Sequence, residues 1–258
     1  MKKIRVGGAI LILLTLLSLL FMGRGEIDSS LRSAPPTLSH ILGCDTLGRD
    51  LLERIGGGVV VSLSISIFTS LLSVFLALVL VAIAINSEFL SSLLLTAVTA
   101  FKSIPTVLVA LLLSSLWGGK TSSCIIALTI TGTASSLRVL MVKAREIYGE
   151  DYMTALDALG IKEGRKRIFH LVPGLFPYAR EEWATIMMSA ILTESSLSFL
   201  GVGIDPSIPS LGSILAEGRP LILTRPHIVI FSSLGLLIIG GAITLISRGL
   251  SELDPTSH

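Results

Sequence analysis

Long apolar runs without a charged side chain constrain the fold of this chain more than any other feature of its sequence. A helix needs about 20 mostly apolar residues to cross the hydrocarbon core of a bilayer. Of the 258 residues, 51% are hydrophobic and only 15% are charged, whereas soluble domains usually carry about 25% charged residues. The runs and the composition together predict an all-α polytopic membrane protein.

About six segments have the length and polarity of transmembrane helices. They are residues 6–23, 59–85, 103–119, 121–137, 184–200 and 228–247. Pro105 is expected to start the third span, because the first turn of a helix tolerates a missing N–H. The stretch 89–100 is apolar but too short to span alone. We expect it to form a helix at the membrane surface or a cytoplasmic extension of the third span.

The basic residues predict the orientation of the chain. With the N-terminus inside, thirteen Lys and Arg residues fall in inside segments and seven in outside segments. The positive-inside rule then places both termini in the cytoplasm, and with them the connection between the fourth and fifth spans. The first run follows Lys2, Lys3 and Arg5, a pattern that a cleaved signal peptide shares. No clear small-residue cleavage site follows it, so we favour a retained helix.

The cytoplasmic connection contains the stretch DYMTALDALGIKEGRKRIFHLVPG, Asp151–Gly174. Asp151 is a plausible N-cap of a short helix, and Gly160 occupies the C′ position, where a left-handed residue ends it. Pro173 is expected to stop or kink a second helix. Four apolar residues follow the i, i+3, i+4, i+7 pattern of one helix face: Tyr152, Ala155, Leu156 and Leu159. So short a helix must pack on something, which favours a docking helix over an ordinary basic loop on the inner leaflet.

Three stretches carry a resemblance to a known family. DYMTALDALGIKEGRKRIFHLVPG resembles the EAA loop of ABC-importer permeases. HILGCDTLGRDLLER, from His40, and LTESSLSFLGVGIDPSIPSLGSILAEGR, ending at Arg219, look like blocks of the peptide/nickel permeases of the dipeptide and oligopeptide C-subunit type. The chain departs from the family pattern at four positions: Ile41, Thr154 in place of the EAA Glu, Leu156 and Leu211.

The resemblance implies a type I ABC-importer permease fold and a division of the chain. Residues 1–58 would form an N-terminal helix and an extracytoplasmic segment, and residues 59–250 the permease domain. The EAA loop would lie near 143–178, and 251–258 would be a short tail. The implied location is a bacterial or archaeal plasma membrane.

The resemblance also implies partners and a role. A permease of this kind forms the translocation pathway for di- or oligopeptides, with nickel or a metal chelate as the alternative cargo. It works with cytoplasmic ABC ATPase subunits, a second homologous permease and an extracytoplasmic substrate-binding protein, and it is not itself an enzyme and binds no cofactor. The ATPase-coupling residues would be Tyr152, Ala155, Leu156, Leu159 and Gly160.

Two further groups of charged residues are candidate sites. Glu194 lies inside the fifth predicted span, where a carboxylate either lines a pathway or forms a structural hydrogen bond. Asp45, Arg49 and Asp50 are possible contacts to the binding protein, in a segment that otherwise reads as an amphipathic helix on the outer surface. The proline-rich loop 201–226 is too irregular for a span, and we expect a short re-entrant or capping structure.

Function classes other than ABC import remain open at this point. A non-ABC channel or a structural membrane protein would use the basic loop for topology alone. An intramembrane enzyme ranks low, because the spans contain no paired Asp, no HExxH and no Ser/His constellation. Cys44 and Cys124 fit no metal or redox spacing. The net charge of +2 gives no indication of a nucleic-acid partner.

Overall fold

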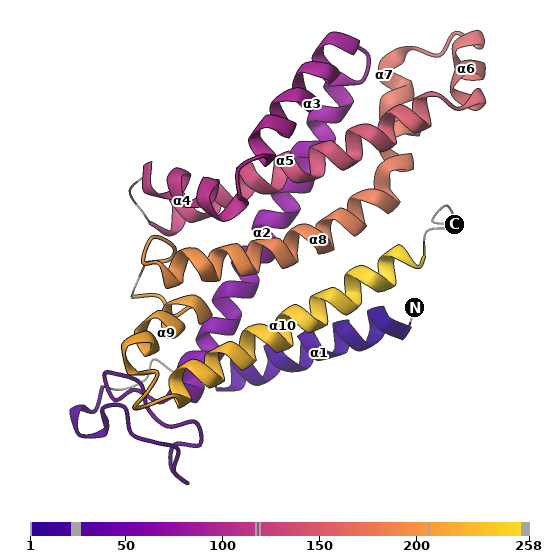
Figure 1. Ribbon diagram of the computed structural model, residues 1–258. Helices are drawn as coiled ribbons and strands as arrows, with labels where there is room; N and C mark the ends of the chain where they lie inside the picture. Colours follow the sequence, from indigo (N-terminus) through magenta and orange to yellow (C-terminus); the bar gives the residue numbers. More distant parts are fainter. Residues whose placement is uncertain (1, 22–26, 117, 119, 206, 254–258) are drawn as a thin grey trace.

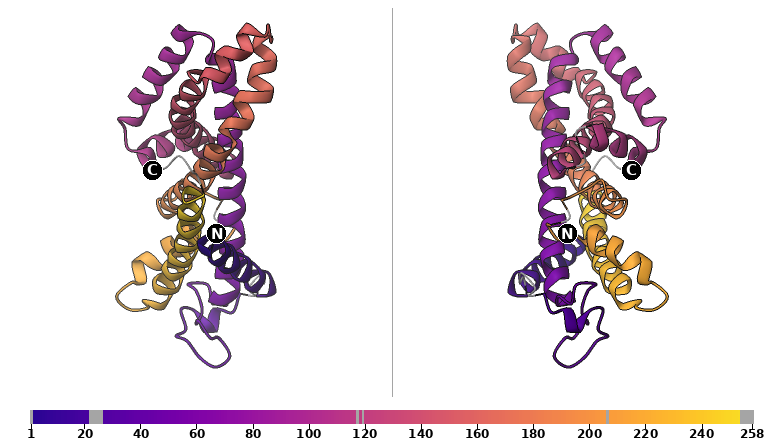
Figure 2. Two further views of the ribbon diagram at one scale, coloured as in Figure 1. Left: turned by 90° about the vertical axis from the view of Figure 1, so that its right-hand side faces the viewer. Right: turned by 90° about the vertical axis from the view of Figure 1, so that its left-hand side faces the viewer.

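The computed structural model describes residues 2–21, 27–116, 118, 120–205 and 207–253. The segment after the first apolar run and most of the predicted tail 251–258 fall outside these residues. The described chain is helical, and its helices form an elongated bundle (Figures 1 and 2). The helices are α1 (Lys2–Leu20), α2 (Leu51–Ala84), α3 (Glu88–Lys102), α4 (Thr106–Leu116), α5 (Thr121–Tyr148), α6 (Asp151–Ala158), α7 (Glu163–Lys166), α8 (Val172–Phe199), α9 (Leu211–Gly218) and α10 (His227–Ser251).

Within the part of the chain that the structure describes, four helices are long and apolar enough to cross a membrane, namely α1, α2, α5 and α10. The prediction of an all-α polytopic membrane protein is thereby confirmed. A fifth span is added if α3 and α4 count as one broken span. The predicted span 184–200 is the second half of α8, which packs against α2, α5 and α10. It is not among the helices of the described residues that qualify by length and composition, so these give four or five candidate spans where the sequence predicts about six.

The third predicted span is wrong as a single helix. Among the described residues of this stretch, the helix Thr106–Leu116 has 11 residues, which corresponds to about 16 Å and roughly half of the hydrocarbon core. Residues 88–102 form the longer helix α3, which meets α4 at a bend of 94°. Pro105 sits in the break, and its carbonyl accepts hydrogen bonds from Leu108 and Val109. Pro105 therefore starts α4 as expected. Residues 89–100 belong to α3, which forms a bent pair with α4; of the two expectations for this stretch, an extension of the third span describes this arrangement better than a separate surface helix.

Packing of α1 against α10 depends on residues without side chains. A Cβ atom added to Gly7 would lie 2.6 Å from the carbonyl oxygen of Ala242, and one added to Gly249 would lie 2.5 Å from Ile4. The two backbones approach closely because both positions are glycine. In Figure 1 the described start of α1 and the end of α10 lie together on the right-hand side.

The bundle has two ends, which are separated along its length in Figure 1. One end carries α6, α7 and the end of α2, above a buried cluster that includes Leu140, Met141 and Leu171. The other end carries residues 27–50, the start of α2 and α9, around a cluster that includes Leu51, Leu211 and Ile228. The loop 201–226, predicted as a capping structure, contains α9 and lies at this second end.

Candidate functional site: the coupling segment and the opposite end of the bundle

The short helix α6 begins one residue earlier than its capping pattern predicts. Asp151 is the first helical residue, and Glu150 is the N-cap without a side-chain hydrogen bond to the helix. The expectation that Asp151 caps the helix is therefore wrong. Its carboxylate instead lies in the first turn, where the positive end of the helix dipole stabilises a negative charge.

The end of α6 is set by Gly160, as the sequence predicts. Gly160 has φ of +71°, and its N–H donates to the carbonyl of Asp157 over 2.9 Å. The N–H of Ile161 donates to the carbonyl of Leu156 over 3.1 Å. These two bonds form a Schellman motif, in which a left-handed residue closes the last turn. A Cβ atom at Gly160 would meet no atom within 4 Å, so only the backbone conformation favours glycine there.

The two faces of α6 have different environments. Met153 is 2% exposed and belongs to the cluster at this end of the bundle, with Leu156 packed against that cluster. Tyr152, Ala155 and Leu159 are exposed, and 76% of the Leu159 surface is accessible. The apolar pattern in the sequence therefore mixes two surfaces. Leu156 and the unpredicted Met153 anchor α6, while the other three present an uncovered apolar surface.

The residues after α6 attach it to the bundle through charges. Lys166, in α7, forms ion pairs with Asp157 and Glu163. Asn86, just beyond the end of α2, donates to Glu163 over 2.8 Å, and Arg167 donates to the carbonyl of Ala82 over 2.9 Å. The hydrogen bonds from Lys166 and Asn86 lower the pKa of the Glu163 carboxyl below its ordinary value.

The second short helix runs into α8 and is not stopped by Pro173. Residues Arg167–Leu171 form a π-helical turn between α7 and α8. Pro173 lies in the first turn of α8 and has no N–H to donate. A wider turn before a proline is one way in which a helix accommodates the missing hydrogen bond.

At the opposite end of the bundle, the predicted receptor contacts have internal partners. Asp45 is 0% exposed, and its carboxylate accepts from the N–H groups of Leu47 and Arg49 and from Arg49 Nε. Asp50 is the N-cap of α2, accepts from Leu52 and Glu53, and pairs with His40 Nδ1 at 2.8 Å. The Asp45 and Asp50 carboxylates are thus engaged within the chain, and burial of Asp45 is incompatible with direct contact to a partner.

The amphipathic helix expected in this segment is also wrong before Leu51. Residues 43–50 form turns, which are joined by a bridge between Cys44 and Asp50.

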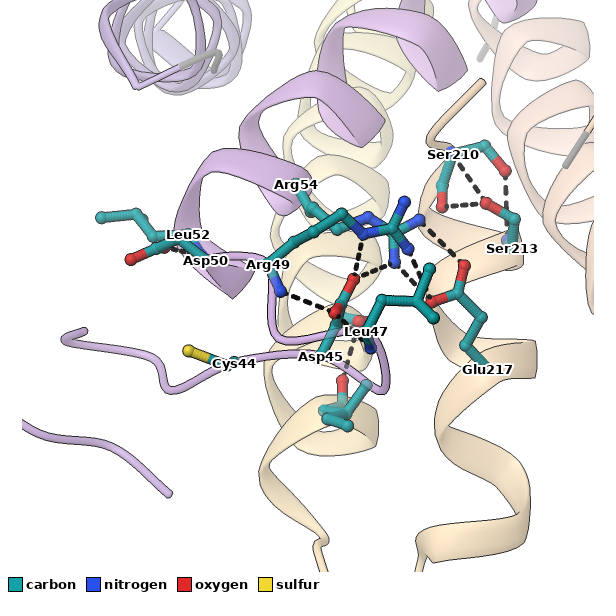
Figure 3. Close-up of polar contacts among 12 residues, drawn as sticks. Cys44, Asp45, Leu47, Arg49, Asp50, Leu52, Arg54, Ser210, Ser213 and Glu217 are labelled. Carbon is teal, nitrogen blue, oxygen red and sulfur yellow. Dashed lines mark hydrogen bonds and ion pairs between the residues drawn. The ribbon is translucent and has the colours of Figure 1, made fainter. Parts of the chain in front are cut away.

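Figure 3 shows a charged residue at the centre of this region that the sequence did not single out. Arg54, in the first turn of α2 and 4% exposed, donates to Asp45 over 2.7 Å. Its other contacts are to Glu217 in α9, with Nη2 2.8 Å from Oε1. The hydrogen bonds from Arg49, together with the charge of Arg54, outweigh the effect of burial and lower the pKa of the Asp45 carboxyl. The network joins residues 45–54 to α9 across 163 positions of sequence.

Comparison with known proteins identifies the family to which this chain belongs. Residues 73–253 match the family model described as binding-protein-dependent transport system inner membrane component. This chain belongs to that family. It is 31% identical to a putative peptide transport system permease protein of Brucella suis biovar 1 (strain 1330), over 98% of this chain and 88% of the relative.

Two other relatives agree with this family assignment. An oligopeptide transport system permease protein of Bacillus subtilis (strain 168) is 26% identical over 98% of this chain and 86% of the relative. A glutathione transport system permease protein of Pectobacterium atrosepticum is 27% identical over 85% of this chain and 74% of the relative. The chain is therefore a multi-pass membrane permease subunit of an ABC transporter and not an enzyme. Membership excludes the reading as a non-ABC channel or structural protein, and it implies an ATPase and a substrate-binding protein as partners.

Within this permease, Glu194 lies in a polar site closed from solvent. Glu194 is 0% exposed and accepts hydrogen bonds from Ser198 over 2.8 Å and from Ser195 over 3.3 Å. Ser62 of α2 and Ser210, the N-cap of α9, also bond to its carboxyl group. Of the two readings left open by the sequence, this geometry favours the structural one, because hydroxyl groups from three helices surround the side chain. Ser198 follows Glu194 by four residues on the same helix, a spacing that the sequence shows, whereas Ser62 and Ser210 are distant in sequence.

Proposed function

We propose that this chain is a translocation subunit of a peptide importer and that α6 is the element that docks on the cytoplasmic ATPase. The observation that carries the second part is the exposed surface of Tyr152, Ala155 and Leu159 on a helix whose other side is anchored by Met153. An amphipathic helix with one uncovered apolar face is suited to a hydrophobic groove on a partner. Thr154, at the position of the EAA Glu, is exposed on the same helix.

The orientation we propose places the α6 end of the bundle in the cytoplasm. This end holds Lys162, Arg165, Lys166 and Arg167, a concentration of basic residues that the positive-inside rule assigns to the cytoplasm. The described start of α1 and end of α10 lie toward the same side of the bundle in Figure 1. The end with Asp45 and α9 would then face the binding protein, with Arg49 and Asp50, both partly exposed, as the remaining candidate contacts among the three predicted residues.

Peptides are the cargo that the comparisons favour. The relatives described above are named as peptide, oligopeptide and glutathione permeases, and glutathione is itself a tripeptide. The nickel alternative has no support of this kind. The second permease of the assembly would be a related chain, since each ATPase of a dimer requires a docking helix.

One experiment tests the proposal in three steps. The tagged chain is purified gently from native membranes, and associated proteins are identified by mass spectrometry. An ATPase, a second permease and a binding protein are expected, and loss of the ATPase with a Leu159→Asp variant would assign the contact to α6. The binding protein is then titrated with a peptide library and with nickel. A chain that never associates with an ATPase, even after cross-linking through a cysteine at position 159, would contradict the docking role.

A further inference from the structure

Lys166 has an environment that differs from that of the other basic residues in the coupling segment. Its residue surface is 2% exposed, although it lies in a polar segment at one end of the bundle. Its Nζ lies 2.5 Å from Asp157 Oδ1, forms a second ion pair with Glu163 and lies 5.7 Å from the ring centroid of Tyr148. The two carboxylates raise the pKa of Lys166, with Asp157 making the larger contribution. One ammonium group therefore joins α6, α7 and the end of α5.

The contacts of Lys166 continue to α2. Glu163 also accepts from Asn86 over 2.8 Å, and Asn86 follows the last residues of α2. Arg167, the residue after Lys166, donates to the carbonyl of Ala82 in the last turn of α2. A continuous set of polar contacts therefore leads from Asp157 on α6 to the end of a helix that traverses the length of the bundle.

The backbone alone holds α6 weakly. The helix has 8 residues and is joined to its neighbours through Gly149 on one side and Gly160 on the other. Glycine connections deform easily. Without side-chain contacts, a displacement of α6 would therefore bend these two connections and would not be passed on to the bundle. The Lys166 ammonium opposes such a movement, because displacing Asp157 breaks the ion pair that joins α6 to α7 and leaves Lys166 with Glu163 alone.

We propose that Lys166 is a positioning residue that fixes α6 relative to the ends of α2 and α5. Displacement of α6 by a docked ATPase is transmitted to α2 through Lys166, Glu163 and Asn86. This inference rests on the proposed docking role of α6 and adds the route by which docking acts on the membrane bundle. It assigns a function to side chains that do not touch the partner.

The test uses the complete transporter, purified and reconstituted with its ATPase, second permease and binding protein. Lys166→Met removes the ammonium and keeps most of the side-chain volume. Asn86→Ala removes the hydrogen bond between Glu163 and the residue after α2, at an exposed position and without leaving a buried charge, while the contact of Arg167 with Ala82 is kept. Lys143→Met is the matched control, since Lys143 also contacts a carboxylate, Glu146, and a tyrosine ring, Tyr178, but from the surface of α5. Each complex is measured for subunit composition, ATPase rate without binding protein, and stimulation by the loaded binding protein.

Lys166→Met and Asn86→Ala are expected to assemble with the ATPase and to keep its unstimulated rate. Both are expected to lose stimulation by roughly fivefold or more, while Lys143→Met behaves as the original chain. Full stimulation in assembled Lys166→Met complexes would overturn the inference. If the Lys166→Met complex does not assemble, the Asn86→Ala complex becomes the test. Full stimulation of the ATPase in the Asn86→Ala complex would overturn the route to α2 through Asn86. A failure of the original chain to bind any ATPase would instead contradict the proposed function.

Discussion

The Arg54 guanidinium lies 2.7 Å from the Asp45 carboxylate, and both side chains are almost completely removed from solvent. Glu217 of α9, which is 163 positions away in the sequence, forms a second ion pair with Arg54. Removal of one member of a buried ion pair leaves an uncompensated charge, which costs more than the pair itself contributes. The end of the bundle opposite α6 therefore depends on Arg54.

The Arg54→Met substitution is expected to lower the free energy of unfolding by up to about 3–5 kcal/mol, because Asp45 and Glu217 lose the buried guanidinium of Arg54 and keep only Arg49 as a cationic partner. Thermal unfolding of the purified protein in detergent, followed by tryptophan fluorescence, measures the change. Arg32→Met is the control, since Arg32 is exposed. Equal melting temperatures for the two variants would show that the network contributes little.

The contribution of Asp45 is expected to depend on pH in the acid range. Its pKa in the folded protein is lowered from the ordinary value of 3.8, so its contribution is complete above that value and is lost as the pH falls through the folded-state pKa. The stability difference between the original chain and Asp45→Asn should be constant from about pH 7 to pH 5 and shrink below 3.8. Melting temperatures of both proteins across this range measure it. A difference that grows on acidification would be inconsistent with a carboxylate that is ionised in the fold.

Substitution of Gly160 tests the left-handed turn that ends α6. Gly160→Val is expected to cost roughly 1–2 kcal/mol or more through backbone strain alone, since no atom lies within 4 Å of a Cβ there. We expect the fold to be retained and the stimulated ATPase activity of the transporter to be lost. Gly160→Asn, which tolerates positive φ better, should retain more activity than Gly160→Val. Equal, unimpaired activity of both variants would argue against a role for the turn in coupling.

The two faces of α6 are expected to respond differently to truncation. Met153→Ala removes a buried side chain and should reduce stability by about 2–4 kcal/mol. Leu159→Ala alters an exposed position, so it should leave the melting temperature unchanged and weaken co-purification of the ATPase. Both variants are compared by thermal unfolding and by the amount of ATPase recovered with the tagged chain. The reverse outcome, a stability loss only for Leu159→Ala, would contradict the assignment of faces.

Substitutions of Glu194 test whether its role is to accept structural hydrogen bonds. Glu194→Leu leaves the Ser195 and Ser198 hydroxyl groups without their acceptor, at about 1–3 kcal/mol for each unsatisfied group. Glu194→Gln keeps an acceptor and is expected to be nearly as stable as the original chain and to transport at a similar rate. Peptide uptake into proteoliposomes and thermal unfolding are measured on both variants. A stable Glu194→Gln protein that has lost uptake would favour the pathway reading instead.

Local features of the fold were predictable because their causes are local. Gly160 ends α6 through two backbone hydrogen bonds that span at most five residues, and such a motif is encoded by adjacent positions. The apolar runs likewise predict membrane helices, since each helix satisfies its own backbone. The helical spacing of Tyr152, Ala155 and Leu159 also predicted that they share one face of α6. The same spacing included Leu156, which the structure packs against the bundle instead.

The tertiary structure decided the features that depend on contacts between distant segments. The buried ion pair of Asp45 and Arg54 is completed by Glu217, 163 positions from Arg54 in the sequence. Two of the hydroxyl groups around Glu194, those of Ser62 and Ser210, come from other segments that only the fold brings to α8. The bend between α3 and α4 and the burial of Lys166 follow from packing in the same way. The sequence by itself determined which segments are helical and apolar, because these properties arise from neighbouring residues. Which charges are buried and paired was decided by the arrangement of the helices, because desolvation and ion pairing depend on every group that surrounds them in space.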